Sequence, residues 1–153
     1  MIRKSNKRDI DEIMDIWLSV NVKAHDFIPA DYWIGHFDMV KEMLPKATVY
    51  VYEDAGGVQA FIGLDDDYVA GIFVDGQSQS RGIGSQLLDY AKQTRDQLTL
   101  HVYEKNERAV SFYKREGFVV GTVQEDVSTG EMELCMKFEA TEEEAKMKYT
   151  PVK

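Results

Sequence analysis

Residues 79–84 read QSRGIG, follow the apolar run GIFV at residues 71–74 and precede a helix-patterned segment that extends to residue 95. A strand that ends in a glycine-containing turn at the start of a helix is typical of an anion site. Glycine lets a ligand approach the backbone, and the first amide groups of the helix point at that ligand with the positive end of the macrodipole behind them. This stretch therefore predicts a strand, a phosphate-binding turn and a helix.

Two other kinds of phosphate site fit the sequence less well. A nucleoside-triphosphate loop needs a Lys-Ser/Thr pair after the last glycine, and Ser85-Gln86 stands there instead. A dinucleotide fingerprint needs a third glycine where Leu87 stands, and an acidic residue at the end of the next strand, which closes with His101-Val102. Both alternatives are disfavoured.

Two ordered motifs connect the chain to a known family. Gln79, Gly82 and Gly84 fit the pattern Q/R-x-x-G-x-G/A, and a second pattern, N-x-x-A-x-x-F-Y-x-x-x-G-F, is matched at residues 106–118. On these motifs the chain resembles the GNAT superfamily of N-acetyltransferases over most of residues 1–138. Residues 17–27, which include His25-Asp26-Phe27, resemble the bacterial YjaB-type members. Members often have proline where Gly76 stands, so we expect a looser loop before the anion site.

The predicted fold is α/β (α+β), a single-domain GNAT-like fold with a mixed, mostly antiparallel sheet. A strand, a helix and another strand around the anion turn imply a right-handed parallel βαβ crossover at the acyl-CoA site. Period-two and helical patterns predict the elements that follow. Strands are expected at residues 2–4, 48–53, 58–64, 68–74, 98–102, 119–127 and 132–138, with about four helices: one capped by Asn6, then 30–43, 82–95 and 106–117. Residues 1–139 form the predicted GNAT domain and residues 140–153 a charged C-terminal tail or frayed helix.

Composition limits the class of protein. A chain of 153 residues forms one domain with a substantial core. The single cysteine, Cys135, excludes an internal disulfide framework, and no export signal or long apolar run occurs, so we expect a cytoplasmic protein with no membrane partner. A formal charge of -9 argues against a nucleic-acid partner. It mildly favours cationic substrates, although the simpler interpretation is that it only keeps the protein soluble.

The resemblance implies acetyl-CoA as the acyl donor and assigns residues to it. The backbone of the strand before the turn pairs with the pantetheine arm, the turn binds the pyrophosphate, and Asn106 contacts the arm. The cofactor-binding residues predicted in this way are Ile72, Phe73, Val74, Gln79, Ser80, Arg81, Gly82, Ile83, Gly84, Ser85, Asn106, Ala109, Phe112 and Lys114. The positive charge that CoA phosphates require is expected from Arg81, Lys105, Arg108, Lys114 and Arg115.

The resemblance also assigns a catalytic acid. Tyr113 lies seven residues after Asn106, so both side chains project from one helix face. A phenol, with an ordinary pKa of about 10, is protonated at neutral pH and can donate to the departing thiolate. The alternative is that Phe112-Tyr113 is an aromatic core pair. His101 and His25 are the candidates for a base, although ordered water can also remove the proton from the amine.

The sequence thus predicts an acetyl-CoA-dependent N-acetyltransferase that acts by direct transfer on a primary amine. We expect a small-molecule acceptor, because the chain is compact and acidic. A protein lysine or N-terminal acetyltransferase and a non-catalytic acyl-CoA-binding sensor or interaction module are the alternatives. Cys135 lies in an apolar run and is not expected to be a nucleophile. No metal site is predicted. The protein is expected to be a monomer or a homodimer.

Overall fold

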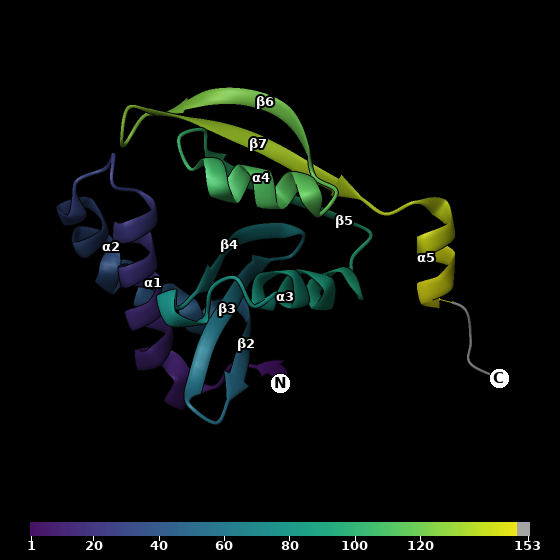
Figure 1. Ribbon diagram of the computed structural model, residues 1–153, viewed down its shortest axis with the longest axis horizontal. Coiled ribbons are helices and arrows are strands. Elements are labelled where there is room, and N and C mark those ends of the chain that lie inside the picture. The colour runs from purple at the N-terminus through teal and green to yellow at the C-terminus, as the bar shows by residue number, and fades with distance from the viewer. Residues whose placement is uncertain (150–153) are drawn as a thin grey trace. The chain divides into compact units, whose positions relative to one another are not determined.

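The computed structural model describes residues 1–149, which form two compact units, Met1–Leu88 and a second that begins at Asp89 (Figure 1). Four strands and two α-helices make up most of the first unit. Its elements are β1 (Ile2–Lys4), η1 (Lys7–Asp9), α1 (Ile10–Ala24), α2 (Ala30–Met43), η2 (Leu44–Lys46), β2 (Thr48–Asp54), β3 (Gly57–Asp65), β4 (Tyr68–Val74) and η3 (Gly76–Ser78).

The sheet of the first unit is antiparallel from β1 through β2 and β3 to β4. Tyr50 lies opposite Ile62, and Ile62 lies opposite Ile72. Helix α1 packs against β3 and β4. Its stripe of Ile13, Met14 and Trp17 is buried, as its helical spacing predicts. The hydrophobic core of this unit therefore fixes the strand that leads into the anion turn.

The start of α1 differs in detail from the sequence prediction. Asn6 is an N-cap, but it caps the 3₁₀ turn η1 rather than α1, which begins at Ile10. The Asn6 side chain accepts from the amide of Arg8 at 3.1 Å, and Asp9 Oδ2 accepts from the amide of Asn6 at 2.8 Å. This reciprocal capping box starts the helical segment one turn before α1.

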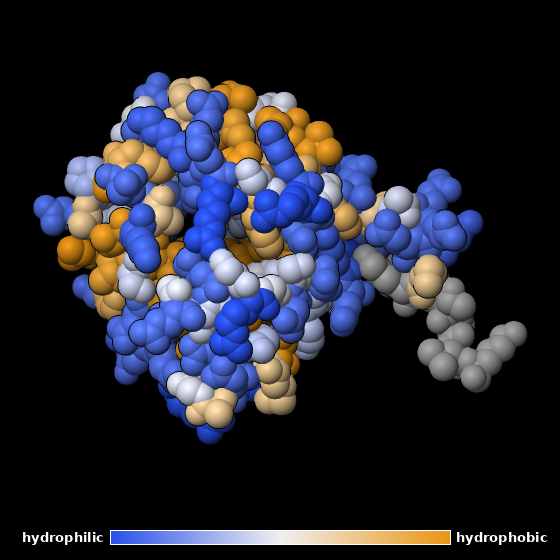
Figure 2. All heavy atoms as spheres, in the orientation of Figure 1, coloured by the Kyte–Doolittle hydropathy of each residue, from blue (hydrophilic) through white to orange (hydrophobic). Residues whose placement is uncertain are grey.

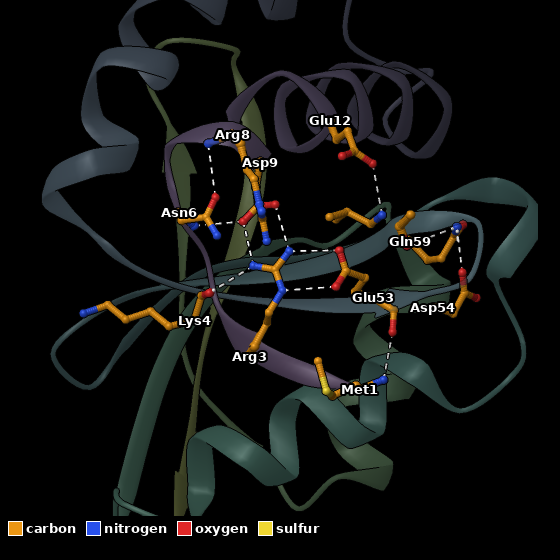
Figure 3. Close-up of polar contacts among 12 residues, drawn as sticks. Met1, Arg3, Lys4, Asn6, Arg8, Asp9, Glu12, Glu53, Asp54 and Gln59 are labelled. Atoms are coloured by element: carbon orange, nitrogen blue, oxygen red, sulfur yellow. Dashed lines mark hydrogen bonds and ion pairs between the residues drawn. The ribbon is translucent and has the colours of Figure 1, made fainter.

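Arg3 joins the first strand to the second strand and to the capping box (Figure 3). Its guanidinium donates to both carboxylate oxygens of Asp9, at 2.8 and 2.9 Å, and to both of Glu53, at 3.3 and 3.0 Å. Asp9 is buried. Hydrogen bonds from Arg3 hold the pKa of Asp9 below its ordinary value of 3.8, against the opposing effect of burial.

Replacing Arg3 with methionine is expected to lower the free energy of unfolding by about 2 kcal/mol, because it leaves the buried Asp9 carboxylate without its main donor. The contribution of a carboxyl group with a lowered pKa is present above its unfolded pKa and is lost as pH falls through the folded value. The parent should therefore lose stability below about pH 4 more steeply than the Arg3→Met variant. Denaturant unfolding across pH measures both effects. Lys41→Met, which removes the exposed 3.4 Å ion pair with Asp11, is the control. An equal loss of unfolding free energy in the two variants would contradict the prediction.

In its described part, residues 89–149, the second unit contains three strands and two helices that begin within it. Helix α3 (Ile83–Lys92) begins in the first unit. The elements that follow it are β5 (Gln97–Tyr103), α4 (Glu107–Arg115), β6 (Val119–Asp126), β7 (Glu131–Glu139) and α5 (Glu142–Tyr149). Strand β7 pairs antiparallel with both β5 and β6. Gly121 forms a bulge in β6, since the register shifts between Val120 and Thr122. Hydrophobic side chains (orange) gather at the top of the view in Figure 2, over β6 and β7. Strand β6 carries the exposed Val119 and Val123, and β7 carries the exposed Met132.

The C-terminal segment is helical where the structure describes it. Helix α5 is capped by Thr141, whose Oγ1 accepts from the amide of Glu144 at 3.1 Å. The sequence predicted a tail or frayed helix here, and residues 150–153 of that segment lie outside the described residues. No helix within residues 1–149 has the length and apolar character needed to span a membrane.

Ending the chain after Thr141 is expected to change the free energy of unfolding by no more than about 0.5 kcal/mol and to leave acetyl-CoA affinity unchanged. The reason is that most of the side chains of residues 142–147 are exposed. This truncation keeps Ala140, whose amide donates to Asp96 O at 2.6 Å. Calorimetric titration with acetyl-CoA and denaturant unfolding measure the two quantities, and a loss of affinity would show that the tail contributes to the site.

Candidate active site

The turn between β4 and α3 has backbone geometry suited to an anion. The backbones of Ser80 and Gly82 both adopt the left-handed conformation, with φ angles of 67° and 77°. Left-handed residues within a turn direct successive amide groups toward a common point. A Cβ at Gly82 would meet no atom within 4 Å, so the space beside this residue is open. The sequence predicted the glycine, but it gave no signal for Ser80, because serine rarely adopts this conformation.

The start of α3 adds a second source of amide groups. The first intrahelical bond runs from the amide of Gln86 to Gly82 O at 3.1 Å. The amides of the first helical turn precede that bond and point out of the helix end. The side chains of Ile83 and Leu87 are buried and hold the helix in place, whereas Gly84 and Ser85 are half-buried. The predicted pyrophosphate residues of the turn therefore lie on one continuous backbone segment.

The side chain of Gln79 bonds to the strand that precedes the turn. Its Nε2 donates to Val74 O at 3.0 Å. Between these two residues, Asp75 caps the 3₁₀ turn η3 by accepting from the amide of Gln77 at 3.3 Å, and the amide of Ser78 donates to Asp75 O at 2.8 Å. Gln79 therefore closes the loop by an internal hydrogen bond, a structural role that the motif alone did not reveal.

The three β4 residues assigned to the pantetheine arm are half-buried. Ile72, Phe73 and Val74 lie opposite Ile62, Phe61 and Ala60 of β3. The ring of Phe73 stacks on that of Phe61, with 4.9 Å between the centroids. Pairing and stacking with β3 fix the backbone of β4 up to the point where the turn begins.

The predicted positive cluster is partly neutralised. Lys105 Nζ lies 3.0 Å from Glu131 Oε2, and Arg81 Nη1 lies 4.0 Å from Asp54 Oδ2. The expectation that Lys105 serves CoA phosphates is weakened, because its charge already has a carboxylate partner. Arg108, Lys114 and Arg115 are exposed on α4.

Helix α4 has well-defined ends. Asn106 Oδ1 accepts from the amide of Ala109 at 3.3 Å and so caps the N-terminus. At the other end, Gly117 has a φ of 95°, its amide donates to Lys114 O at 3.2 Å, and the amide of Phe118 donates to Tyr113 O at 3.0 Å. These bonds form a Schellman motif. They confirm the helix that the sequence predicted between the asparagine and the glycine.

Tyr113 is 8% exposed and sits among aromatic rings. The ring centroids of Phe112 and Phe118 lie 5.3 and 5.5 Å from its own, both edge-on. This packing fixes the direction of the Tyr113 ring, as a positioned acid requires, and it equally satisfies the interpretation of an aromatic core residue. The two interpretations therefore differ in the role of the hydroxyl group, not in the environment of the ring.

The two histidines named as candidate bases have different environments. His101 is exposed on β5 while Leu100 and Val102 are buried, which confirms the predicted alternation. His25 follows α1 and is half-buried, and burial lowers the pKa of its imidazole. Its ring stacks on Trp33 at 5.1 Å and meets Phe27 edge-on at 5.7 Å. A lowered pKa keeps the imidazole neutral at neutral pH, the state that a base requires.

Comparison with known proteins identifies the family. The model of the acetyltransferase (GNAT) domain matches residues 45–120. Peptidyl-lysine N-acetyltransferase YiaC from Escherichia coli (strain K12) is 33% identical over 120 residues, which cover 77% of this chain and 82% of that protein. The chain belongs to the GNAT family of acetyltransferases. Peptidyl-lysine N-acetyltransferase YjaB from the same strain is 32% identical over 78% of this chain and 82% of its own length.

Solved structures of the GNAT family agree with this assignment. The solution structure of apo-form YjaB from Escherichia coli superposes with a TM-score of 0.81 and 28% identity, over 92% of this chain and 98% of that one. This similarity confirms the GNAT-like mixed α/β fold and the YjaB-type resemblance that the sequence predicted. The protein is a GNAT acetyltransferase that depends on acetyl-CoA as its acyl donor.

The turn fits the donor that the GNAT family uses. Acetyl-CoA carries a pyrophosphate, and the left-handed backbone at Ser80 and Gly82, the open space at Gly82 and the amides of the first turn of α3 suit such a group. The guanidinium of Arg81 lies in the same turn and adds positive charge, which the carboxylate of Asp54, 4.0 Å away, partly offsets. The chemistry of these features fits a pyrophosphate group.

Proposed function

We propose that this protein transfers the acetyl group of acetyl-CoA to the ε-amino group of lysine residues in proteins. The observation that carries the proposal is its similarity to two relatives named peptidyl-lysine N-acetyltransferases, YiaC and YjaB, each matched over most of both chains. The sequence-based preference for a small amine rested on a compact, acidic chain. Acidity attracts a lysine-rich polypeptide as well as a small cation, so it does not separate the two acceptors.

The proposed reaction is a direct transfer. Acetyl-CoA supplies a thioester, and the amide C–N bond forms as the C–S bond breaks. The backbone amides of residues 81–85 hold the pyrophosphate, and the backbone of Ile72, Phe73 and Val74 holds the pantetheine arm. Asn106 offers its amide group to the same arm, while its Oδ1 caps α4. Holding both reactants in register replaces a bimolecular encounter with an aligned pair, which supplies much of the acceleration.

Tyr113 is the proposed acid, because its hydroxyl can give a proton to the departing thiolate. The lysine must lose a proton to attack, and His25 and His101 are the proposed acceptors of that proton, directly or through water. His25 fits better by its chemistry, because burial lowers the pKa of its imidazole and keeps it neutral. The exposed His101 can pass a proton directly to bulk water.

The experiment that tests this function compares two classes of acceptor under identical conditions. The protein is incubated with acetyl-CoA and one of two classes of acceptor. The first class is lysine-containing peptides and unfolded proteins, and the second is a panel of small primary amines. Acetylation is located by mass spectrometry, and thiol release is measured in parallel. We expect acetyl-lysine at rates well above the reaction without protein, which corrects for spontaneous acetylation.

Other outcomes would favour the other candidates. Turnover of small amines without acetylation of lysine in peptides would establish a small-molecule acceptor. Binding of acetyl-CoA without transfer to either class would indicate a non-catalytic acyl-CoA-binding module.

A further inference from the structure

Gln59, near the start of β3, bonds to both ends of the short helical turn that precedes the anion turn. Its side-chain Oε1 accepts from the hydroxyl of Ser78 at 2.9 Å, and its backbone oxygen accepts from the amide of Asp75 at 2.8 Å. Asp75 and Ser78 are the first and last residues of the bonded segment around η3. One residue of β3 therefore fixes the start and the end of this loop.

The buried end of the loop depends on that contact. Ser78 is 4% exposed, whereas Gly76 and Gln77 beside it are exposed. A buried hydroxyl needs a hydrogen-bond partner, and Gln59 provides one. Gly76 carries no side chain that could restrict its backbone, so the loop gains order from the bonds at its two ends.

The other end of the Gln59 side chain reaches a carboxylate that also faces the anion turn. Its Nε2 donates to Asp54 Oδ1 at 3.2 Å (Figure 3), and Asp54 Oδ1 accepts from the amide of Gly56 at 2.8 Å. Asp54 Oδ2 lies 4.0 Å from Arg81 Nη1. The tip of the β2–β3 hairpin therefore contacts the loop before the turn through Gln59 and the turn itself through Asp54.

We propose that Gln59 is a positioning residue for acetyl-CoA, which keeps the anion turn in its binding shape by fixing Asp75 and Ser78. It is not a catalytic residue, because it acts through the loop. The inference rests on the proposed binding of pyrophosphate at residues 81–85. A turn that is already ordered loses less conformational entropy when a ligand binds, so the hydrogen bonds of Gln59 favour binding.

The test separates affinity from chemistry. Gln59→Met keeps the length of the side chain and removes both hydrogen-bonding groups. We expect the dissociation constant of acetyl-CoA, measured by calorimetric titration, to rise about tenfold, the equivalent of one or two neutral hydrogen bonds. The single-turnover rate at saturating acetyl-CoA should stay within about twofold of the parent, because the reacting groups are unchanged.

A second variant tests the same contact from the other side. Ser78→Ala removes only the hydroxyl bond, so it should weaken binding less than Gln59→Met, which also loses the donor to Asp54. The double variant should be little worse than Gln59→Met alone, because both changes break the same bond between Ser78 and Gln59. Gln59→Glu keeps an acceptor for Ser78 and loses the donor to Asp54, so its affinity should lie between those of the parent and Gln59→Met. Gln124→Met is the matched control, because Gln124 Nε2 donates to Glu133 Oε1 at 2.9 Å in the second unit.

Two results would overturn the inference. One is an unchanged dissociation constant in folded Gln59→Met and Ser78→Ala proteins, whether or not their melting temperatures fall, since a merely structural residue would lower stability alone. The other is a lower rate at saturating acetyl-CoA with unchanged affinity. If the parent itself binds no acetyl-CoA, the proposed cofactor site is wrong, and the inference fails with it. The binding measurement on the parent thus distinguishes the two failures.

Discussion

Replacing Tyr113 with phenylalanine is expected to lower the single-turnover rate of acetyl transfer about a hundredfold or more, the usual contribution of a positioned acid. The affinity for acetyl-CoA should persist. The variant keeps the ring and its packing against Phe112 and Phe118, so the aromatic cluster remains intact. The hydroxyl group that would protonate the thiolate is lost. Rapid mixing with saturating acetyl-CoA and an accepted amine measures the chemical step.

The expected result discriminates between the two interpretations of Tyr113. If the residue served packing alone, removing one oxygen would leave the rate and the affinity almost unchanged. Steady-state turnover is a poor measure here, since slow product release would hide a loss in the chemical step. A parental single-turnover rate in the Tyr113→Phe protein would assign the proton to water or to another donor.

A matched control is available in the same unit. Tyr103 donates from its hydroxyl to Asp126 Oδ2 at 2.5 Å, which ties the end of β5 to the end of β6. Tyr103→Phe also removes one phenolic oxygen, and we expect it to lower stability without the large loss in single-turnover rate. Equal losses of rate in the two variants would show that the effect is not specific to Tyr113.

Local sequence signals were sufficient for much of the fold. Helix α4 was predicted between Asn106 and Gly117, because an asparagine cap and a left-handed glycine mark the ends of a helix through bonds made within a few residues. Helix α2 was predicted at residues 30–43, as the structure has it. Helix α3 was predicted to continue to residue 95, but it ends at Lys92. The local signal for α5 was Thr141, whose Oγ1 accepts from the amide of Glu144 as a helix cap, but the charged composition obscured it.

Contacts between distant segments were beyond the sequence patterns. The bond between Gln59 and Ser78 spans 19 residues, and nothing in either local pattern indicates it. The stacking of His25 on Trp33 likewise depends on how α2 packs against α1. The left-handed backbone of Ser80 is imposed by the surrounding turn against the intrinsic preference of serine. The motif therefore predicted which segment forms the glycine turn and the start of the helix, but not how the protein holds that segment in shape.

Replacing Gly82 with tryptophan is expected to raise the dissociation constant of acetyl-CoA about a hundredfold or more, equivalent to the loss of one or two charge-assisted hydrogen bonds. A Cβ at this position meets no protein atom within 4 Å, so an indole would enter the open space where we propose that the pyrophosphate binds. The amides of the turn would then be covered rather than removed. Calorimetric titration with acetyl-CoA and with CoA measures the loss, and circular dichroism establishes that the variant is folded.

The backbone of Gly82 adds a second effect, which controls can separate from the first. Any other residue at a φ of 77° is strained by about 1 kcal/mol. Gly82→Ala introduces this strain with little bulk, so it should lower affinity far less than the tryptophan does. Gly130 has a similar φ of 75° and also has no atom within 4 Å of its Cβ position, and it lies in the turn between β6 and β7. Gly130→Trp therefore matches the strain and the bulk at a turn with no proposed role, and it should bind acetyl-CoA like the parent. If folded Gly82→Trp protein also binds like the parent, the pyrophosphate does not lie at the start of α3.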